Sequence, residues 1–261
     1  MDERVEINRR LWDERVPSHV ASDFYDVETF VTGRSTLAPF EVDEVGPVEG
    51  KRLCHLQCHF GLDTLTWARL GAETVGIDFS APAIDAARQL AERIDLAERA
   101  SFVVSTVEDA RATLDGDFDI VYVSWGALIW LPDLRRWADA VASLLRSGGF
   151  LYLAEMHPYA TALRWGEGYG GGAATFFDEP DGTYADRDAV FEHNASWEFS
   201  HGIGDVITAV AAAGLRVEWL HEWPFTTWNL NDDTMVRRED GMWSLPDSTV
   251  PLSYSLKASR P

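Results

Sequence analysis

Short apolar runs and longer amphipathic stretches follow one another through the middle of the chain. The short runs, bounded by polar residues and glycine, predict buried strands, and stretches whose apolar residues recur every three or four positions predict helices. The clearest helix begins after Ser80, a suitable N-cap, with Pro82 in its first turn. We predict strands at residues 53–56, 73–78, 101–105, 119–124, 150–154, 215–222 and 252–259. We predict helices at residues 7–15, 63–70, 81–96, 134–145 and 201–213, the first ended by Pro17.

This alternation is typical of an α/β fold with a doubly wound parallel sheet and right-handed crossovers. The regular pattern ends at Pro158. Residues 158–200 are rich in glycine and isolated aromatic residues, which indicates an insertion or lid, with a short hairpin around Asp181 and Gly182. We therefore expect an N-terminal cap over residues 1–46 and a main domain over residues 47–261 that carries the insertion.

The charge of the chain narrows the class of partner. With 261 residues the chain has room for one large domain or two small ones, and its formal net charge is −21. A field of that sign repels phosphate backbones and anionic membranes, so we expect no nucleic acid and no membrane as partners. A neutral or cationic small molecule fits better. The alternative is that the charge serves solubility alone, and the sequence does not indicate an oligomeric state.

The cysteine pattern and the first residues point to the cytoplasm. The two cysteines, Cys54 and Cys58, lie only four positions apart, which is unfavourable for a structural disulfide and suits a reducing compartment. The first residues are charged and lack the apolar stretch of a signal peptide. The sequence has no run of about 18 apolar residues that would span a membrane.

The segment after the first predicted strand indicates a nucleotide-like site. In an open α/β sheet, ligands bind beyond the carboxyl ends of the strands, and Asp78 follows the first turn at the distance where a carboxylate accepts hydrogen bonds from ribose. Gln57 and His59 stand where a phosphate-binding loop has glycine, while the helix start at residues 62–64 still attracts a carboxylate. This favours an adenosine that carries an amino acid over a dinucleotide. The predicted cofactor-binding residues are Gln57, Cys58, His59, Gly61, Asp78, Phe79, Thr106, Val107, Glu108, Ser124 and Trp125.

Over residues 51–158 the chain resembles the class I S-adenosylmethionine-dependent methyltransferases. The resemblance rests on four segments: residues 52–61, residues 76–80, residues 102–109, and residues 144–151, where Ser147 replaces a usual proline. A bacterial subgroup with small-molecule substrates carries Leu-Gln-Cys-His-Phe-Gly at the place of residues 56–61, so the missing glycines look like a subgroup trait. The resemblance implies a Rossmann-like, seven-stranded, mostly parallel sheet whose last strand pair is antiparallel. It also implies S-adenosyl-L-methionine as cofactor and S-adenosyl-L-homocysteine as product.

Such a cofactor carries its own activated methyl group, so the protein needs mainly to bind, align and desolvate. A general base helps when the acceptor is a hydroxyl of high pKa. Our candidates are His157, His201 and His19, each of which is at least as well explained as a structural histidine. Glu155 and Glu222 are candidates to orient a histidine or bind an amine, or else are solvated or paired.

Tryptophan is abundant, with 11 residues, several of them outside the predicted helices. We predict an aromatic substrate pocket that includes Trp12, Tyr25, Trp130 and Trp197, the alternative being ordinary core packing. The Cys54-His55-x-x-Cys58-His59 pattern suggests a metal site. However, Cys54 and His55 point to opposite faces of a strand, so we predict no metal.

The leading hypothesis is therefore a small-molecule methyltransferase that uses direct in-line displacement onto an O, N, S or C nucleophile. One alternative is a protein of this fold that binds the cofactor without transferring a methyl group, because fold does not imply function. Another is an NAD(P)-dependent oxidoreductase, against which the absence of Gly-x-Gly-x-x-Gly argues.

Overall fold

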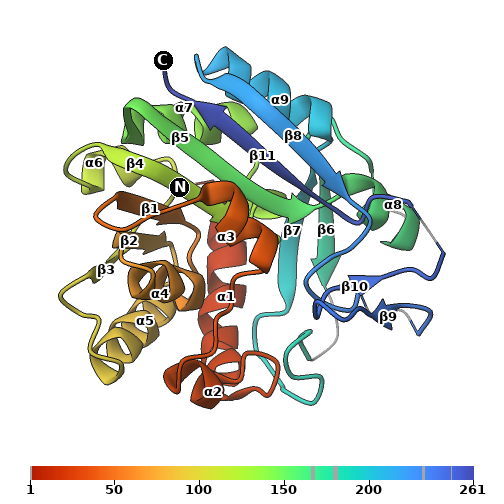
Figure 1. Ribbon diagram of the computed structural model, residues 1–261. Coiled ribbons are helices and arrows are strands. Elements are labelled where there is room, and N and C mark those ends of the chain that lie inside the picture. The colour runs from red at the N-terminus through yellow and green to blue at the C-terminus, as the bar shows by residue number, and fades with distance from the viewer. Residues whose placement is uncertain (1, 166–167, 179–181, 231–232, 248) are drawn as a thin grey trace.

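A seven-stranded sheet forms the centre of the computed structural model, which describes residues 2–165, 168–178, 182–230, 233–247 and 249–261 (Figure 1). The strand order is β3-β2-β1-β4-β5-β11-β8, parallel from β3 to β5, with β11 antiparallel to both neighbours. The strands are β1 (Arg52–Leu56), β2 (Glu73–Asp78), β3 (Ala100–Val104), β4 (Phe118–Ser124), β5 (Leu145–Met156), β8 (Arg216–Trp223) and β11 (Ser253–Ser259). The predicted doubly wound α/β class and the antiparallel last pair are confirmed.

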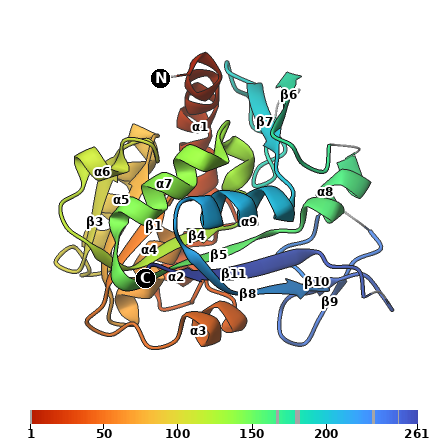
Figure 2. The same ribbon diagram turned by 90° about the horizontal axis from the view of Figure 1, so that it is seen from above.

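Helices cover both faces of the sheet (Figures 1 and 2). One face carries α3 (Pro39–Val45), α4 (Leu62–Arg69) and α5 (Ala81–Arg93), and the other carries α6 (Ala110–Thr113), α7 (Leu134–Leu144) and α9 (Ile203–Ala212). Alternate residues of one strand enter different cores, since Leu53 packs on the first face and Cys54 on the second. No helix of the described residues is long and apolar enough to cross a membrane.

The first helix is longer than predicted. Helix α1 runs from Glu3 to Ala21 with Pro17 inside it, so the predicted end at Pro17 is wrong. An internal proline costs about 3 kcal/mol because it removes a hydrogen bond and crowds the preceding turn. The buried residues Val16 and His19 lie on either side of Pro17, and tertiary packing of a helix face outweighs local propensity.

The insertion carries a two-stranded antiparallel ribbon of β6 (Ala173–Asp178) and β7 (Ala195–Ser200). Residues 179–194 join these strands, and the predicted turn at Asp181 lies outside the described residues. Strand β5 was predicted over residues 150–154 and is longer in the structure. It begins at Leu145, which pairs with Phe118 of β4. The remaining short elements are α2 (Val27–Val31), η1 (Leu128–Trp130), α8 (Pro158–Trp165), β9 (Val236–Arg237) and β10 (Trp243–Ser244).

Helix α1 and residues 183–197 lie against each other and form what we call the roof (Figure 2). The buried Asn8 amide forms two hydrogen bonds with the backbone of Trp197, donating to its carbonyl and accepting from its N–H, both at 2.8 Å. Ser18 donates to Asp186 at 2.8 Å, and His19 contacts the Thr183 hydroxyl at 3.2 Å. Polar contacts along one face of α1 therefore fix it to a segment far away in sequence.

Replacing Asn8 with alanine is expected to loosen the roof. The change leaves the N–H and carbonyl of Trp197 without the Asn8 partner in a partly buried place, which costs about 1–3 kcal/mol. Hydrogen exchange at the Trp197 amide should quicken by one to two orders of magnitude, while exchange in β1 stays unchanged. Arg10→Ala, on the exposed side of α1, is the control. Unchanged protection at Trp197 would contradict this view of the roof.

Candidate cofactor and substrate site

A cavity of about 540 Å³ opens at the carboxyl ends of β1 to β4, beneath the roof. Its volume falls in the range of about 300–1,000 Å³ that is usual for small-molecule sites. Trp12 and Tyr184 line it from the roof, and Tyr25 lines it from the segment between α1 and α2. From the sheet side it is lined by residues that follow the strands, among them Gln57, His59, Asp78, Phe79, Thr106, Val107, Glu108, Ser124, Trp125 and Trp130.

The turn after β1 holds two side chains in an unusual backbone conformation. Gln57 has φ +55° and His59 has φ +52°, values that L-residues other than glycine adopt rarely and at a cost. The Gln57 amide donates to the carbonyl of Ala127 at 2.9 Å, which fixes its orientation. The Gln57 Oε1 and His59 Nε2 atoms are buried and have no hydrogen-bond partner among the described residues. Two cavity-lining residues therefore each have an unused hydrogen-bonding atom.

Asp78 lies at the end of β2 and is buried at 7% exposure. Its carboxylate accepts hydrogen bonds from the N–H groups of His59 and Ser80, both at 2.9 Å. Burial raises the pKa of Asp78 to about 6, and these hydrogen bonds oppose the shift. Because Asp78 also lines the cavity, its free lone pairs suit a ligand with two adjacent hydroxyl groups.

Glu155, at the end of β5, anchors the loop after β4. Its buried carboxylate accepts from the backbone N–H groups of Gly126 at 2.6 Å, Ala127 at 2.9 Å and Leu128 at 3.2 Å. Trp125, which precedes this clamp and lines the cavity, has φ +40°. From the sequence, Glu155 was expected to orient a histidine, to bind an amine, or to be solvated or paired. Its role as acceptor for the loop was missed because the sequence signal is weak. That signal consists only of an acid at the end of a buried strand and a glycine, Gly126, after another strand.

A buried polar network lies below the cavity floor. The Ser124 hydroxyl donates to Asp63 at 3.1 Å and contacts His55 Nε2 at 3.4 Å. Nearby, Glu41 is fully buried and accepts from the Tyr122 hydroxyl at 2.6 Å. Burial raises the pKa of Glu41 to about 8, and the carboxyl of Asp63 adds to the shift. The carboxyl of Glu41 is therefore mostly protonated at neutral pH.

Glu41 should make the stability of the protein pH-dependent. Its folded-state pKa of about 8 exceeds the ordinary value of 4.5, so the folded state binds the proton more tightly. The free energy of unfolding should fall as pH rises from 6.5 to 8, by up to about 1.4 kcal/mol per pH unit. Glu41→Gln should flatten this slope, and Glu92→Gln, on an exposed helix face, should not. Urea unfolding across that range checks it, and an unchanged slope in Glu41→Gln would contradict it.

The three predicted catalytic histidines do not line the cavity. His157 Nε2 contacts Glu222 at 2.9 Å, and His201 Nε2 contacts the carbonyl of Leu131 at 2.7 Å. His19 lies behind His59, with ring centroids 5.3 Å apart. No contact tests their catalytic role, which stays a prediction.

The other predicted residues divide into two groups. Trp12, Tyr25 and Trp130 line the cavity, whereas Trp197 packs on Phe176 with ring centroids 5.2 Å apart. Cys58 and Gly61 belong to the turn but not to the lining. Gly61 has φ +82°, and a Cβ there would lie 2.6 Å from the ring of Phe102, so no larger residue fits without a shift. Cys54 and Cys58 are buried in different cores.

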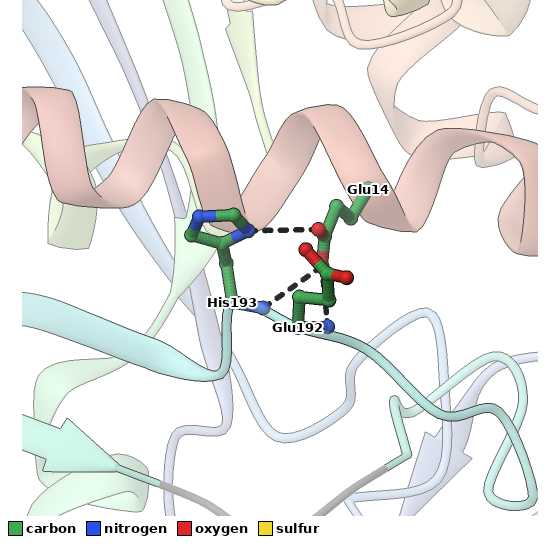
Figure 3. Close-up of side chains that lie close together, drawn as sticks. All are labelled: Glu14, Glu192 and His193. Atoms are coloured by element: carbon green, nitrogen blue, oxygen red, sulfur yellow. Dashed lines mark hydrogen bonds and ion pairs between the residues drawn. The ribbon is translucent and has the colours of Figure 1, made fainter.

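One group of potential metal ligands occurs among the described residues, formed by Glu14, Glu192 and His193 (Figure 3). Glu14 accepts from the N–H groups of Glu192 and His193, both at 2.9 Å, and contacts His193 Nδ1 at 2.7 Å. The hydrogen bond from His193 lowers the pKa of Glu14. These contacts join α1 to the insertion, so the group acts as part of the roof.

The comparisons with known proteins agree with this architecture. Residues 54–149 match the family model described as a methyltransferase domain. The fold is that of the class I methyltransferases. The S-adenosylmethionine-dependent methyltransferase from Mesorhizobium loti superposes with a TM-score of 0.59 at 17% identity, covering 88% of this chain and all of that one. The glycopeptide N-methyltransferase MtfA with sinefungin gives a TM-score of 0.58 at 16% identity, covering 84% and 90%.

Curated relatives are ubiquinone biosynthesis O-methyltransferases. That of Xanthomonas euvesicatoria pv. vesicatoria (strain 85-10) is 30% identical over 62% of this chain and 64% of its own length. That of Xanthomonas axonopodis pv. citri (strain 306) is 34% identical over 44% of this chain and 47% of its own. The chain thus spans less than two thirds of the length of these relatives.

Proposed function

We propose that this protein is an S-adenosylmethionine-dependent methyltransferase that acts on a small molecule. The observation that carries the proposal is the buried Asp78 carboxylate at the end of β2, in a cavity whose lining also includes Gln57 with its unpartnered Oε1. A nucleoside diol and an amino-acid end match these groups. The family model and the solved relatives support the same class.

The residues that line the cavity fit this cofactor. Asp78 would hold the ribose, Phe79 and Val107 would lie against the adenine, and the α4 end after Gly61 would attract the carboxylate. Gln57 Oε1 would accept from the ammonium group. When bound, S-adenosylmethionine supplies the activated methyl group. This chain's part is to orient the acceptor and exclude water.

The acceptor is not fixed by the fold. Relatives are named as an O-methyltransferase of ubiquinone biosynthesis, a glycopeptide N-methyltransferase and a geranyl diphosphate C-methyltransferase. We infer a neutral or cationic acceptor, because five acidic side chains and only two arginines line the cavity. We also infer that the cap of residues 1–46 and the insertion of residues 158–200 act together as a lid, which the roof contacts support.

We further propose that the reaction takes place in the cytoplasm, a location that the two free, buried cysteines favour. The sequence Leu-Gln-Cys-His-Phe-Gly at residues 56–61 supports membership of the small-molecule subgroup.

Calorimetry tests the proposal. S-adenosylmethionine and S-adenosylhomocysteine should bind the purified full chain with micromolar affinity, and NADH should not. No binding of either adenosyl compound would overturn the cofactor assignment. Binding with no methylated product from any acceptor panel would instead support a protein that binds the cofactor without transfer.

A further inference from the structure

The structure sets His59 apart from the other histidines. All seven lie in described segments, and His59 alone lines the cavity. Five of the others have imidazole partners on other elements or in the network below the floor: His55, His157, His193, His201 and His221. His19 contacts the Thr183 hydroxyl. Among the described residues His59 Nε2 has no hydrogen-bond partner, and His59 is the histidine whose side chain borders the cavity.

We propose that His59 is the residue that contacts the methyl acceptor, and that the acceptor is an uncharged aromatic compound with a hydroxyl group. This inference rests on the proposed function and specifies its substrate class. From the sequence, His59 was predicted to bind the cofactor.

Aromatic rings surround the imidazole. The ring centroids of Trp12, Tyr25 and Phe60 lie 5.4, 5.5 and 4.6 Å from that of His59. Trp130 lies edge-on to Trp12 at 5.3 Å. Trp12, Tyr25 and Trp130 also line the cavity, so an aromatic guest would gain both burial and ring contacts from them. The cavity next to His59 therefore favours a planar ring.

The charges near His59 favour a neutral acceptor. Burial and the neighbouring His19 lower the pKa of His59 well below its usual range, so the ring is uncharged at neutral pH. A neutral imidazole has one nitrogen that accepts a hydrogen bond. The surplus of acidic lining residues disfavours an anionic acceptor. An amine would be held as ammonium by that acidic lining, and the ammonium form has no lone pair with which to attack.

The transfer step follows from these groups. The acceptor oxygen attacks the methyl carbon, the C–S bond breaks, and its electron pair remains on sulfur as S-adenosylhomocysteine forms. The hydroxyl proton passes to His59 Nε2 and then to water. The proton moves as the C–O bond forms, because the oxygen becomes strongly acidic at that stage. A weakly basic, buried imidazole is therefore sufficient.

Calorimetry on protein loaded with S-adenosylhomocysteine tests the inference, with catechol and toluene as probes. Catechol should bind the natural protein more tightly than toluene, which has no hydroxyl group. His59→Phe keeps the ring packing and removes the nitrogen, so it should weaken catechol binding about fivefold to tenfold, which is the size of one hydrogen bond. His221→Phe, on the exposed edge strand β8, is the matched control and should change nothing.

The experiment distinguishes failure of the proposed function from failure of this inference. Failure of the natural protein to bind S-adenosylhomocysteine would defeat the proposed function and this inference with it. Three results, each with normal cofactor binding, would overturn the inference alone: tighter binding of toluene than of catechol, no catechol binding, or equal catechol affinity in His59→Phe. If His59→Phe does not fold, His59→Gln replaces it. There the amide oxygen should restore part of the affinity for catechol, and the absence of any change from the natural protein would again overturn the inference.

Discussion

Asp78→Ala should lower the affinity for S-adenosylhomocysteine by at least about 100-fold. A ribose diol would donate two hydrogen bonds to this buried carboxylate, and hydrogen bonds to charged groups are worth about 1.5–3 kcal/mol each. The change also removes the acceptor for the N–H groups of His59 and Ser80, which shape the turn after β1. Isothermal calorimetry measures the loss directly.

The pH dependence sharpens this prediction. The carboxylate form of Asp78 is needed as acceptor, and its pKa is raised to about 6, so affinity should fall as pH drops through about 6. Asp78→Asn keeps the size and should bind weakly without that pH dependence. Asp85→Ala, an exposed acid on α5, is the control and should bind normally. Natural affinity in Asp78→Ala would refute the ribose role.

Glu155→Ala should cause the largest loss of stability. It leaves the N–H groups of Gly126, Ala127 and Leu128 without an acceptor in a buried place. Each unsatisfied group costs about 1–3 kcal/mol, so the loss should be about 4 kcal/mol, a fall in Tm of about 10 °C. Cofactor affinity should fall as well, because the same loop carries Trp125 into the cavity lining. Thermal unfolding and calorimetry measure the two effects.

Two further variants serve as controls for Glu155→Ala, one at the same position and one at another glutamate. Glu155→Gln retains one acceptor oxygen and should lose about half as much stability. Glu222→Ala removes an exposed acid whose partner is His157, and should shift Tm by a degree or two. A Tm in Glu155→Ala within that small range would show that the loop holds its shape without the clamp.

The sheet was predictable because its strands and helices obey local rules. Ser80 caps α5 by accepting from the N–H of Ala83, as its position before Pro82 indicates. Asp78 and Ser124, which the rule on the carboxyl ends of strands selects, line the cavity. The predicted helix end at Pro17 was wrong because α1 is stabilised by packing in the folded chain. The residues next to Pro17 in the sequence do not reveal that packing.

The contacts that each histidine makes could not be predicted from the sequence. Nothing in the sequence tells that His157 reaches Glu222 or that His201 reaches Leu131, because these contacts depend on how β8 and the loop before α7 are placed. Gln57 and His59 could be recognised as unusual from the sequence, because they stand where a phosphate-binding loop has glycine. The structure adds that their backbone remains in the glycine-like conformation, so the side chains are kept at a conformational cost.

The roof joins parts of the chain that a ribosome makes far apart in time. Asn8 and Trp197 are separated by 189 residues, which corresponds to about 10–40 s of synthesis. Helix α1 is synthesised before β7 and finds its partner only after β7 has been made, and in proteins most helical stability comes from tertiary packing. We therefore expect nascent chains that end before β7 to expose Trp12 and Val16 to chaperones. Closure of the cavity is then a late event in the biogenesis of this protein.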